Sequence, residues 1–565
     1  MPARRPSAAL AILATLLLAA ATPLAAGELV LQAPRDIREL LTPYLPDEAG
    51  SPQRLQGTLS EILATEGYFA PVFEFKDSDG ELYLTLDPGP RTLIARVDLS
   101  IAGPLDATTR QQLEKDWHLP VGQPFRQDDW NAAKQQVLAR LLASEHADAK
   151  LVDSEAAIDV EKHSAELHAH YEAGPRYRFG ALRVEGLERY DPSLVERYNR
   201  AVQPGQPYSE ERLNALQGTL QATPYFASVR TTIDREAAEI DADGTATVPV
   251  VVRVRERSPQ RVSFGAGASS NTGARVEVNY HDNDLFGHAW ELDSGLRLEQ
   301  KKQTAYADVF LPPDARFRRN SVGVMAEATD IAGLKTERYA SGAQTVQQRG
   351  SVEQRLSINW QHELREPDGA ESVTSRALVP NAMWTWRHVD SLLNPRRGIV
   401  LQGQVGGGAK AALSDQNFVR LHSRVQFYVP LGQRDTLTLR GEAGYTLADS
   451  RQHIPQDYLF RAGGAGSVRG YAYQSLGIKE GAATVGGRYL AIASAEVTHW
   501  LSEDWGVAAF VDAGDALDSL KDARPALGYG LGARWRSPAG PIGVDLAYGE
   551  RTRGFQLHFS LAIPF

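Results

Sequence analysis

The sequence predicts an all-β 16-stranded transmembrane β-barrel preceded by three small α+β domains. Three observations predict this fold: strict alternation of apolar and polar residues in the C-terminal half, a self-similar unit repeated in the N-terminal half, and an export signal at the start. Alternation matters because a strand points successive side chains to opposite faces. An exported chain without membrane-spanning helices can enter a membrane only as a closed barrel.

The export signal is predicted over residues 1–26. Arg4 and Arg5 give a basic start, an apolar run covers 8–21, and small alanines follow before residue 27. The run is short for the ~20 residues that a spanning helix needs, which favours a signal peptide over an uncleaved anchor. Cleavage is expected between Ala21 and Ala26.

Composition argues against several functional classes. The chain has a net charge of −10 and no strongly basic block, so nucleic acid is not an expected partner. With no cysteine it has neither a disulfide framework nor a thiolate metal site. The sequence has no Gly-x-Ser-x-Gly elbow and no His-Glu-x-x-His helix. We therefore expect no enzymatic activity, no catalytic residue, no metal and no cofactor.

The N-terminal half contains a unit that repeats with a period of roughly 80 residues, as tandem domains do. A Gly-Gln-Pro signature opens a helical pattern at 122–124 and again at 205–207, whereas the first unit lacks it. Each unit is predicted to run strand, helix, helix, strand, strand. The predicted domains cover residues 27–94, 95–177 and 178–258, and the barrel covers residues 259–565.

From residue 261 onward, alternating segments follow one another to the C-terminus. In residues 419–429 an apolar set alternates with Arg420, His422 and Arg424. Arginines facing the core of a soluble sandwich would be unpaired and costly, whereas a water-filled barrel lumen accepts them. The segments begin near residues 261, 275, 289, 303, 318, 335, 350, 375, 398, 416, 435, 486, 504, 525, 540 and 554. An even number of strands is typical of bacterial outer-membrane barrels.

The longest connection between these segments, about residues 449–483, follows the eleventh strand and should lie on the outside. Loops of this length are usually functional. It contains a glycine-rich stretch that ends in Val468, Arg469, Gly470 and Tyr471. By composition alone this is an ordinary surface loop with an exposed arginine. A phosphate-binding loop is disfavoured because the glycines do not lie between a strand and a helix.

Two further groups of residues have simpler explanations than a ligand site. His281, Asp282 and Asp284 could form a metal cluster, but a polar extracellular turn explains them better. Four tryptophans are expected in the aromatic girdle at the membrane interface rather than in a ligand cage. These are Trp384, Trp386, Trp500 and Trp505.

Several motifs together resemble the BamA/TamA superfamily of outer-membrane assembly barrels. They are the tetrad at 468–471, the Phe-Val-Asp-Ala-Gly-Asp strand at 510–515, the glycine-rich hairpin at 528–542 and the terminal Phe565. In this family the repeats are POTRA domains in the periplasm and the barrel lies in the outer membrane. Three repeats resemble the TamA branch, because BamA-type members usually carry five and two-partner secretion transporters carry two behind a plug helix.

The resemblance also implies a structural cluster in the lumen. In the family the loop arginine reaches back into the barrel and pairs with acidic residues on the twelfth and thirteenth strands. The matching positions are Arg469, Glu496 and Asp512. Alternation independently favours an inward Asp512, since a carboxylate on the lipid face would cost a few kcal/mol. We expect this cluster to act as a scaffold.

The function implied by the resemblance is the folding and insertion of β-barrel substrates, autotransporters in the TamA branch. The implied partners are unfolded outer-membrane proteins, the lipid bilayer and an inner-membrane-anchored, periplasm-spanning TamB-like protein. A weakly closed seam would offer an unfolded strand an edge on which to pair. The seam is expected between the first strand, weakened by Gly265 and Gly267, and the last strand, which ends in Pro564 and Phe565.

Two alternative functions fit a barrel of this kind. A secretion transporter would pass a polypeptide through its lumen, but it would carry a plug helix before the repeats, which residues 27–34 do not convincingly provide. A passive porin has no use for three exported repeats.

Overall fold

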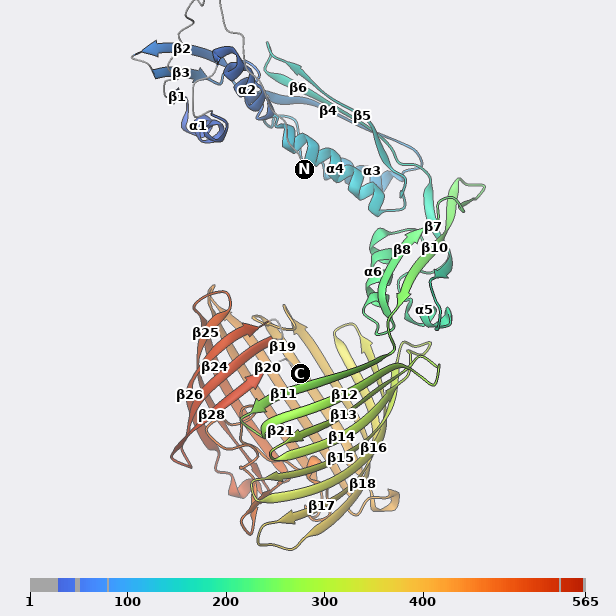
Figure 1. Cartoon of the computed structure of the whole chain (residues 1–565), viewed down its shortest axis with the longest axis vertical. Helices are drawn as coiled ribbons and strands as arrows, with labels where there is room; N and C mark the ends of the chain where they lie inside the picture. The colour runs from blue at the N-terminus through green and yellow to red at the C-terminus, as the bar shows by residue number, and fades with distance from the viewer. Residues whose placement is uncertain (1–28, 46–50, 79–80, 538–539, 562–565) are drawn as a thin grey trace, which may run out of the picture. The chain divides into compact units, whose positions relative to one another are not determined.

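The computed structural model describes residues 29–45, 51–78, 81–537 and 540–561 (Figure 1). The predicted signal peptide and the seam residues Pro564 and Phe565 lie outside the described residues. The chain divides into two compact units. One is built from residues up to 181, with 202–213 and 233–250, and the other from 182–201, 214–232 and 251–565.

The three repeats have the predicted order of elements, and the third adds a two-residue strand. The first contains β1 (Leu29–Gln32), α1 (Arg35–Leu41), α2 (Pro52–Thr65), β2 (Val72–Ser78) and β3 (Glu81–Asp87). The second contains β4 (Leu93–Ala102), α3 (Ala107–Lys115), α4 (Gln127–Ala143), β5 (Lys150–Asp159) and β6 (Ser164–Glu172). The third contains β7 (Arg176–Glu185), α5 (Ser193–Tyr198), α6 (Glu210–Gln221), β8 (Phe226–Ile233), β9 (Glu239–Ile240) and β10 (Thr245–Glu256).

In each repeat the last long strand lies at the centre of the sheet, in the orders β1-β3-β2, β4-β6-β5 and β7-β10-β8. The domain boundaries predicted at 94/95 and 177/178 fall just inside β4 and β7. A Gly-Pro-Arg sequence precedes each strand, at 89–91 and 174–176. β4 begins two residues after Arg91 and β7 begins at Arg176, in both cases earlier than the apolar alternation alone indicates.

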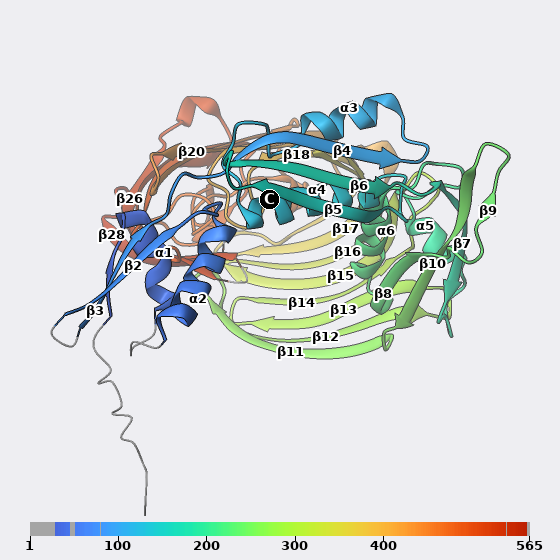
Figure 2. The same cartoon turned by 90° about the horizontal axis from the view of Figure 1, so that it is seen from above.

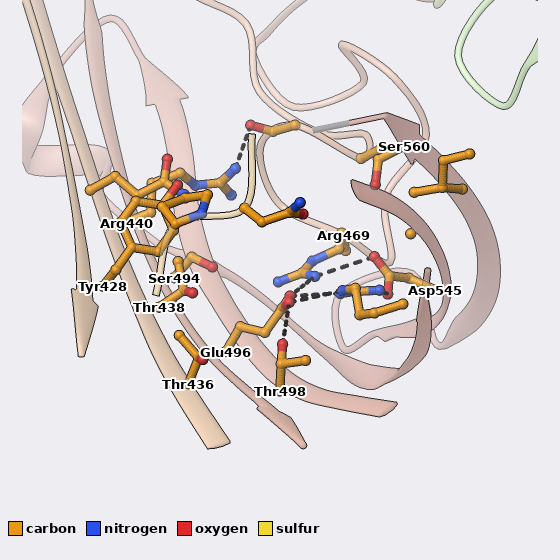
Figure 3. A pocket seen from close by; sticks show the side chains of 18 of the residues that line it. Tyr428, Thr436, Thr438, Arg440, Arg469, Ser494, Glu496, Thr498, Asp545 and Ser560 are labelled. Atoms are coloured by element: carbon orange, nitrogen blue, oxygen red, sulfur yellow. Dashed lines mark hydrogen bonds and ion pairs between the residues drawn. The ribbon is translucent and has the colours of Figure 1, made fainter. Parts of the chain in front are cut away.

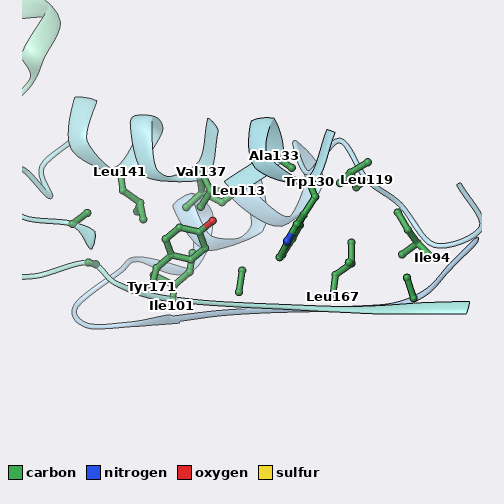
Figure 4. Packing of buried hydrophobic residues seen from close by; sticks show 14 of the residues in the cluster. Ile94, Ile101, Leu113, Leu119, Trp130, Ala133, Val137, Leu141, Leu167 and Tyr171 are labelled. Atoms are coloured by element: carbon green, nitrogen blue, oxygen red, sulfur yellow. The ribbon is translucent and has the colours of Figure 1, made fainter. Parts of the chain in front are cut away.

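The second repeat shows how these small domains are stabilised. Trp130, Ala133, Val137 and Leu141 of α4 recur at the spacing that places them on one helix face. They point toward the sheet, where Tyr171 is fully buried (Figure 4). The hydroxyl of Tyr171 donates to the Lys134 carbonyl oxygen at 3.0 Å, so the buried polar atom is satisfied.

The first and second repeats are joined through the residue that ends α2. Glu66 accepts hydrogen bonds from Arg126 Nε and Nη2, at 2.8 and 2.9 Å, and from Arg91 at 3.3 Å. Phe69 packs against Phe125, with ring centroids 6.0 Å apart. The hydrogen bond from Arg126 lowers the pKa of Glu66, although burial opposes this. The joint therefore contains both an ion pair and an apolar contact.

The C-terminal part forms one 16-stranded antiparallel sheet in which neighbours follow chain order (Figures 1 and 2). Its strands are β11 (Gln260–Ser269), β12 (Gly273–Leu285), β13 (Trp290–Glu299), β14 (Lys302–Phe310), β15 (Arg319–Ile331), β16 (Leu334–Arg349), β17 (Val352–Pro367), β18 (Val373–Val389), β19 (Gly398–Gly408), β20 (Phe418–Leu431), β21 (Asp435–Leu447), β24 (Tyr489–Trp500), β25 (Trp505–Leu517), β26 (Ala526–Ser537), β27 (Gly540–Gly549) and β28 (Gly554–Leu561). The predicted fold class is confirmed, and the largest error in a strand start is residue 486 against Tyr489.

The two faces of the barrel wall differ as the alternation predicts. On β20, Val419, Leu421 and Phe427 are exposed on the outer face, whereas Tyr428 of the alternate set is buried. None of the helices in the described ranges is long and apolar enough to cross a membrane.

One of the four tryptophans is not where the girdle prediction places it. Trp384, Trp386 and Trp505 are exposed on the outer face. Trp500 shares the inner face of β24 with Glu496 and Thr498, and lies beneath the guanidinium of Arg536. The prediction was wrong because side chains alternate between the two faces of β24, and Trp500, its last residue, falls in the inward-facing set.

The His281, Asp282 and Asp284 group also differs from its prediction. These residues lie near the end of β12, which pairs with the start of β11 through Gln260 and Asp282. The chain enters β11 from the third repeat, so these residues lie at the end of the barrel to which the third repeat attaches, and not in an extracellular turn. The Asn283 side chain donates to the Pro224 carbonyl oxygen at 2.9 Å. The group therefore contributes to the attachment of the third repeat.

The connection between β21 and β24 carries structure of its own. It contains a 3-10 turn at Gln456–Tyr458 and a hairpin of β22 (Ile478–Glu480) and β23 (Ala483–Val485). Its apolar residues Phe460, Val468 and Tyr471 are buried in a cluster with Leu490 of β24. The loop thus lies inside the barrel instead of over its rim.

Candidate functional site

The long loop places Arg469 against the inner wall of the barrel. The Arg469 side chain is 7% exposed, and that of Asp512 on β25 is fully buried. Arg469 Nε donates to Asp512 Oδ2 at 2.7 Å, Nη2 donates to Oδ1 at 2.9 Å, and the Arg469 backbone N–H donates to Oδ2 at 3.0 Å. A guanidinium fork matches a carboxylate in this two-pronged geometry. The guanidinium also lies over the Phe510 ring, 3.4 Å from its centroid.

Three more strands complete the charge network. Glu496 on β24 accepts from Arg469 Nη1 at 2.6 Å and from Arg534 Nη2 of β26 at 2.7 Å. Asp545 on β27 accepts from Arg534 Nη1 at 2.5 Å and from Arg469 Nη1 at 3.3 Å. Figure 3 shows Arg469 between Glu496 and Asp545. Two guanidinium groups and three carboxylates are thus linked in one ion-pair network in the lumen.

Glycines on the neighbouring strands make room for the loop backbone. A Cβ at Gly528 of β26 would overlap the carbonyl oxygen of Arg469, and a Cβ at Gly549 of β27 would overlap that of Gly470. Gly470 itself has a φ of 90° and lies against Tyr548 and Gly549. Glycine alone adopts this φ without strain. The loop tip therefore fits closely against the wall.

The residues beside Arg469 extend the attachment to the last strand. The Gly470 N–H donates to His558 Nε2 of β28 at 3.0 Å. The Tyr471 hydroxyl donates to the Leu527 carbonyl oxygen at 2.9 Å and accepts from the Arg551 N–H at 3.0 Å. Val468 is fully buried. Together with Arg469, these contacts tie the tetrad to each of the five strands from β24 to β28.

A cavity of about 440 Å³ adjoins the cluster and is lined by Arg469, Glu496, Arg534 and Asp545, with Ser560 of β28. Arg440 of β21 lies on its wall and donates to the carbonyl oxygens of Gly466 and Ser467, at 2.8 and 2.5 Å. The charges around the cavity hold the loop. Within the described ranges no three His, Asp or Glu side chains are arranged to bind a metal.

The seam lies between β11 and β28. In the described part of the chain, β11 pairs only with β12, and β28 pairs only with β27. One hydrogen bond links the two sides there, from the Phe559 N–H to Ser270 Oγ at 3.2 Å. Phe264 on β11 is 81% exposed, and Gly265 packs its backbone against the Glu277 side chain. The described backbone at this edge therefore has unpaired hydrogen-bonding groups on both sides.

The structure brings Arg469, Glu496 and Asp512 together, and it adds residues that sequence reasoning did not assign to the cluster. Arg534, Asp545 and His558 join the same network. Arg534 and Asp545 fall on inward positions of their strands, so alternation identifies the face. The stagger between neighbouring strands decides which inward-facing residues come into contact. This stagger cannot be derived from the sequence alone.

Comparison with known proteins places this geometry in a family. Residues 258–565 match the Omp85 superfamily domain. The chain belongs to the Omp85 superfamily. Residues 177–257 match a POTRA domain, described as a surface antigen variable number repeat. The Omp85 barrel is therefore an outer-membrane barrel with periplasmic POTRA domains.

Similar proteins include outer-membrane assembly factors. The chain is 23% identical over 468 residues to the outer membrane protein assembly factor BamA of Neisseria meningitidis, covering 74% of this chain and 56% of that protein. It is 24% identical over 392 residues to BamA of Nitratidesulfovibrio vulgaris, covering 65% of this chain and 47% of that protein. The chain thus spans about half the length of these curated relatives.

A solved structure of another Omp85 protein has the same fold. The crystal structure of BamA from Haemophilus ducreyi lacking POTRA domains 1–3 matches with a TM-score of 0.70 and 18% identity, over 83% of this chain and 99% of that chain. The predicted membership of the BamA/TamA superfamily is confirmed. The narrower TamA assignment stays a prediction.

Proposed function

We propose that this Omp85 protein is an outer-membrane insertase that folds and inserts β-barrel proteins through the seam between β11 and β28. The observation that carries the proposal is that, among the described residues, a single hydrogen bond crosses that seam, from Phe559 to Ser270. The BamA relatives, which are named as outer membrane protein assembly factors, support the same role.

The physical reason is the cost of an unpaired backbone in lipid. An unfolded substrate strand has to satisfy its N–H and C=O groups before it enters hydrocarbon, at several kcal/mol for each unsatisfied group. An open edge of a sheet offers these groups partners through strand addition. The proposed role requires no catalytic residue and no cofactor.

The narrower form of the proposal follows the TamA branch. Its support is the three-repeat organisation, and it names autotransporters as substrates and a TamB-like protein anchored in the inner membrane as the partner. Cross-linking the protein in cells and identifying the proteins that copurify tests both. Capture of a periplasm-spanning protein and of autotransporter barrels is the expected result.

Crosslinking the seam tests the general proposal. The native chain has no cysteine, so engineered pairs are clean to interpret. Ser270→Cys combined with Phe559→Cys spans the observed hydrogen bond, and a disulfide needs Cα atoms within about 7 Å. A second pair should join the stretch at residues 262–266 to the stretch at residues 559–563. Oxidation should block substrate insertion in cells, and reduction should restore it.

A matched control places the disulfide between strands that are already paired. Leu546 of β27 and Leu557 of β28 are register partners, so Leu546→Cys with Leu557→Cys staples β27 to β28 and leaves the seam free. This variant should insert substrates in both redox states. Full activity with the seam disulfide demonstrably formed would instead favour passage of a polypeptide through the lumen.

A further inference from the structure

Two glycines shape the lumen side of the seam strand β11. Phe264 is 81% exposed on the outer face, whereas the alternate residues Gly265 and Gly267 carry no side chain on the lumen face. Their register partners on β12 are Glu277 and Arg275. Residues directly opposite each other in a sheet share a face, so both charged side chains lie on the lumen face as well.

The Glu277 side chain lies over Gly265, in the space that a larger residue would fill. A Cβ at Gly265 would lie 2.8 Å from Glu277 Cγ and 2.9 Å from Glu277 Oε1. Arg297 Nε of β13 donates to Glu277 Oε2 at 3.0 Å, and Arg275 Nε lies 3.7 Å from the same oxygen. Both ion pairs use Oε2. In the described part of the chain, Oε1 has no donor and is not enclosed by protein, so it remains free to accept a hydrogen bond.

Arg275 takes the corresponding place two residues further along β11. A Cβ at Gly267 would lie 3.5 Å from Arg275 Nη2 and 3.7 Å from Nε, which is ordinary contact. The Arg275 side chain is 40% exposed and lies 3.7 Å from Glu277 and 4.0 Å from Glu299, too far for hydrogen bonds. The lumen side of β11 therefore has an acceptor over Gly265 and donors over Gly267, ~7 Å apart along the strand.

The charges beside the seam are balanced, so they favour an alternating charge pattern over a single sign. Arg275 and Arg297 are positive, and Glu277 and Glu299 are negative. In the described residues none of these side chains forms an ion pair with β28. The acceptor and the donors are therefore available to a strand that pairs with the free edge of β11.

A substrate strand that pairs with β11 brings its own lumen-facing side chains to this place. In an antiparallel pairing, such as β12 forms on the other edge, residues opposite Gly265 and Gly267 have Cβ atoms ~4.5–5.5 Å from the glycine positions. With glycine there, no β11 side chain separates them from β12. A lysine or arginine opposite Gly265 thus reaches Glu277 Oε1, and a carboxylate opposite Gly267 reaches Arg275.

We propose that Glu277 and Arg275 bind lumen-facing side chains of the incoming strand and so fix the register in which it pairs with β11. The preferred strand has a carboxylate opposite Gly267 and, two residues later, a cationic side chain opposite Gly265. A slip of one residue exchanges the lipid and lumen faces of the strand, and a slip that moves the carboxylate opposite Gly265 places like charges together. This positioning role rests on the proposed insertase function and deepens it.

Disulfide trapping of a substrate tests the seam and gives the register. Vesicles containing the full-length Ala266→Cys protein receive a small outer-membrane barrel protein from urea, with single cysteines along its first or last strand. These strands are the edges of an unfinished sheet. The cysteine that forms the disulfide lies opposite Ala266, so its two neighbours in sequence lie opposite Gly265 and Gly267. No trapped complex at any position would overturn the insertase proposal, and the positioning role with it.

Coupling between charges tests the positioning role alone. In a substrate with aspartate opposite Gly267 and lysine opposite Gly265, Glu277→Gln should lower the trapped yield about two- to fivefold, as for ion pairs that water reaches. Replacing the substrate lysine with glutamine should have the same effect, and combining both changes should add nothing further. Arg275→Gln should couple in this way to the substrate aspartate. Glu353→Gln is the matched control and should leave the yield unchanged, because Glu353 is a lumen-side carboxylate of β17 with 21% side-chain exposure, against 19% for Glu277.

Reversing the two charges in the substrate needs no further variant of this protein. Lysine opposite Gly267 and aspartate opposite Gly265 should lower the trapped yield of the Ala266→Cys protein by at least the same factor. An unchanged yield would overturn the positioning role, while the trap itself upholds the seam. So would an equal loss in Glu277→Gln for substrates with lysine and with glutamine, in variants that keep folded-barrel gel mobility.

Discussion

Arg469 carries five N–H donors on one guanidinium, and the barrel wall meets them with carboxylates from three different strands. A buried network of this kind specifies geometry more than it adds stability, because desolvation cancels much of the attraction between the charges. Removing one charged side chain from the network, in contrast, lowers stability. The remaining charges are then buried without compensation, which costs about 3–5 kcal/mol.

Arg469→Ala should therefore lower the temperature at which the folded barrel converts to its slow-migrating form on semi-native gels, and should impair assembly in cells. Asp512→Ala should do the same, and the double substitution should be no worse than additive, because the two residues share one interaction. Arg349→Ala removes an exposed arginine and should leave both measurements unchanged. If Arg469→Ala kept the stability and activity of the unaltered protein, the ion pairs of Arg469 would not be needed for function.

Gly528→Ala tests the close approach of the loop without changing any charge. The added Cβ would overlap the Arg469 carbonyl oxygen, so the tip must shift, at the roughly 1–3 kcal/mol typical of overpacking. Gly466→Ala is the matched control within the same loop, since its Cβ would meet nothing within 4 Å. Only Gly528→Ala should lower the gel-shift temperature. Equal behaviour of the two variants would contradict a tightly fitted loop.

Sequence reasoning at this scale reached Arg469, Glu496 and Asp512 through family resemblance, with alternation giving the face of Asp512. It missed Asp545 and His558, whose positions opposite the loop depend on how strands slide past each other. It also misplaced Trp500, because an error of one residue in the alternation at a strand end moves a side chain from the lipid face to the lumen face.

At the scale of elements, the joint between the first two repeats is built from parts that recur in the chain. Glu66 follows α2 and bonds to Arg126 at the start of α4. Asp148 follows α4 and accepts from Tyr177 at 2.5 Å, with Arg235 at 2.7 Å. In both cases a carboxylate after the second helix of one repeat receives donors from the next repeat. Such pairs orient neighbouring domains more than they stabilise either one.

The Glu66 joint should loosen at acid pH. Its carboxyl pKa is lowered in the folded protein by the hydrogen bond from Arg126, so the pair contributes above the unfolded pKa and is lost as pH falls through the folded value. Spin labels on Gln56→Cys and Gln135→Cys should give a narrow distance distribution at neutral pH that broadens on acidification. Glu66→Gln should broaden it at every pH. Glu39→Gln, which removes an exposed pair in the same repeat, should not.

The long strands and helices were predictable because their apolar residues recur with periods of 2 and 3.6 residues. The short elements were not. The β22–β23 hairpin and β9 have too few residues to show a period, and pairing with a neighbour gives them their form. The role of Asn283 at the barrel entrance likewise depends on Pro224, a residue distant in the chain.

At the scale of the whole molecule, the barrel wall has one weakly joined pair of neighbouring strands, at the seam between β11 and β28. Fifteen neighbouring pairs of strands are joined by ladders, whereas a single hydrogen bond crosses the seam in the described residues, from Phe559 of β28 to Ser270 directly after β11. Ladders are cooperative, so most of the wall should resist detergent while the seam opens first.

Heat modifiability tests the intact barrel. The membrane-extracted protein should migrate faster before boiling than after it, because the paired strands resist detergent at room temperature. It should also fractionate with the outer membrane. Identical mobility before and after boiling, with recovery in the soluble periplasm, would contradict the barrel architecture.

The loop tip also constrains the order in which the chain can fold. Arg469 precedes Asp512 by 43 residues and Asp545 by 76, and Gly470 precedes His558 by 88. The tetrad is therefore made before every strand that holds it, and its last contact must wait for β28. Insertion of the tip is a terminal step in maturation, reached only by chains that have completed their own C-terminal strands. In a truncated or stalled barrel, Arg469 lacks some of its partners. The loop tip of such a barrel therefore cannot complete its contacts.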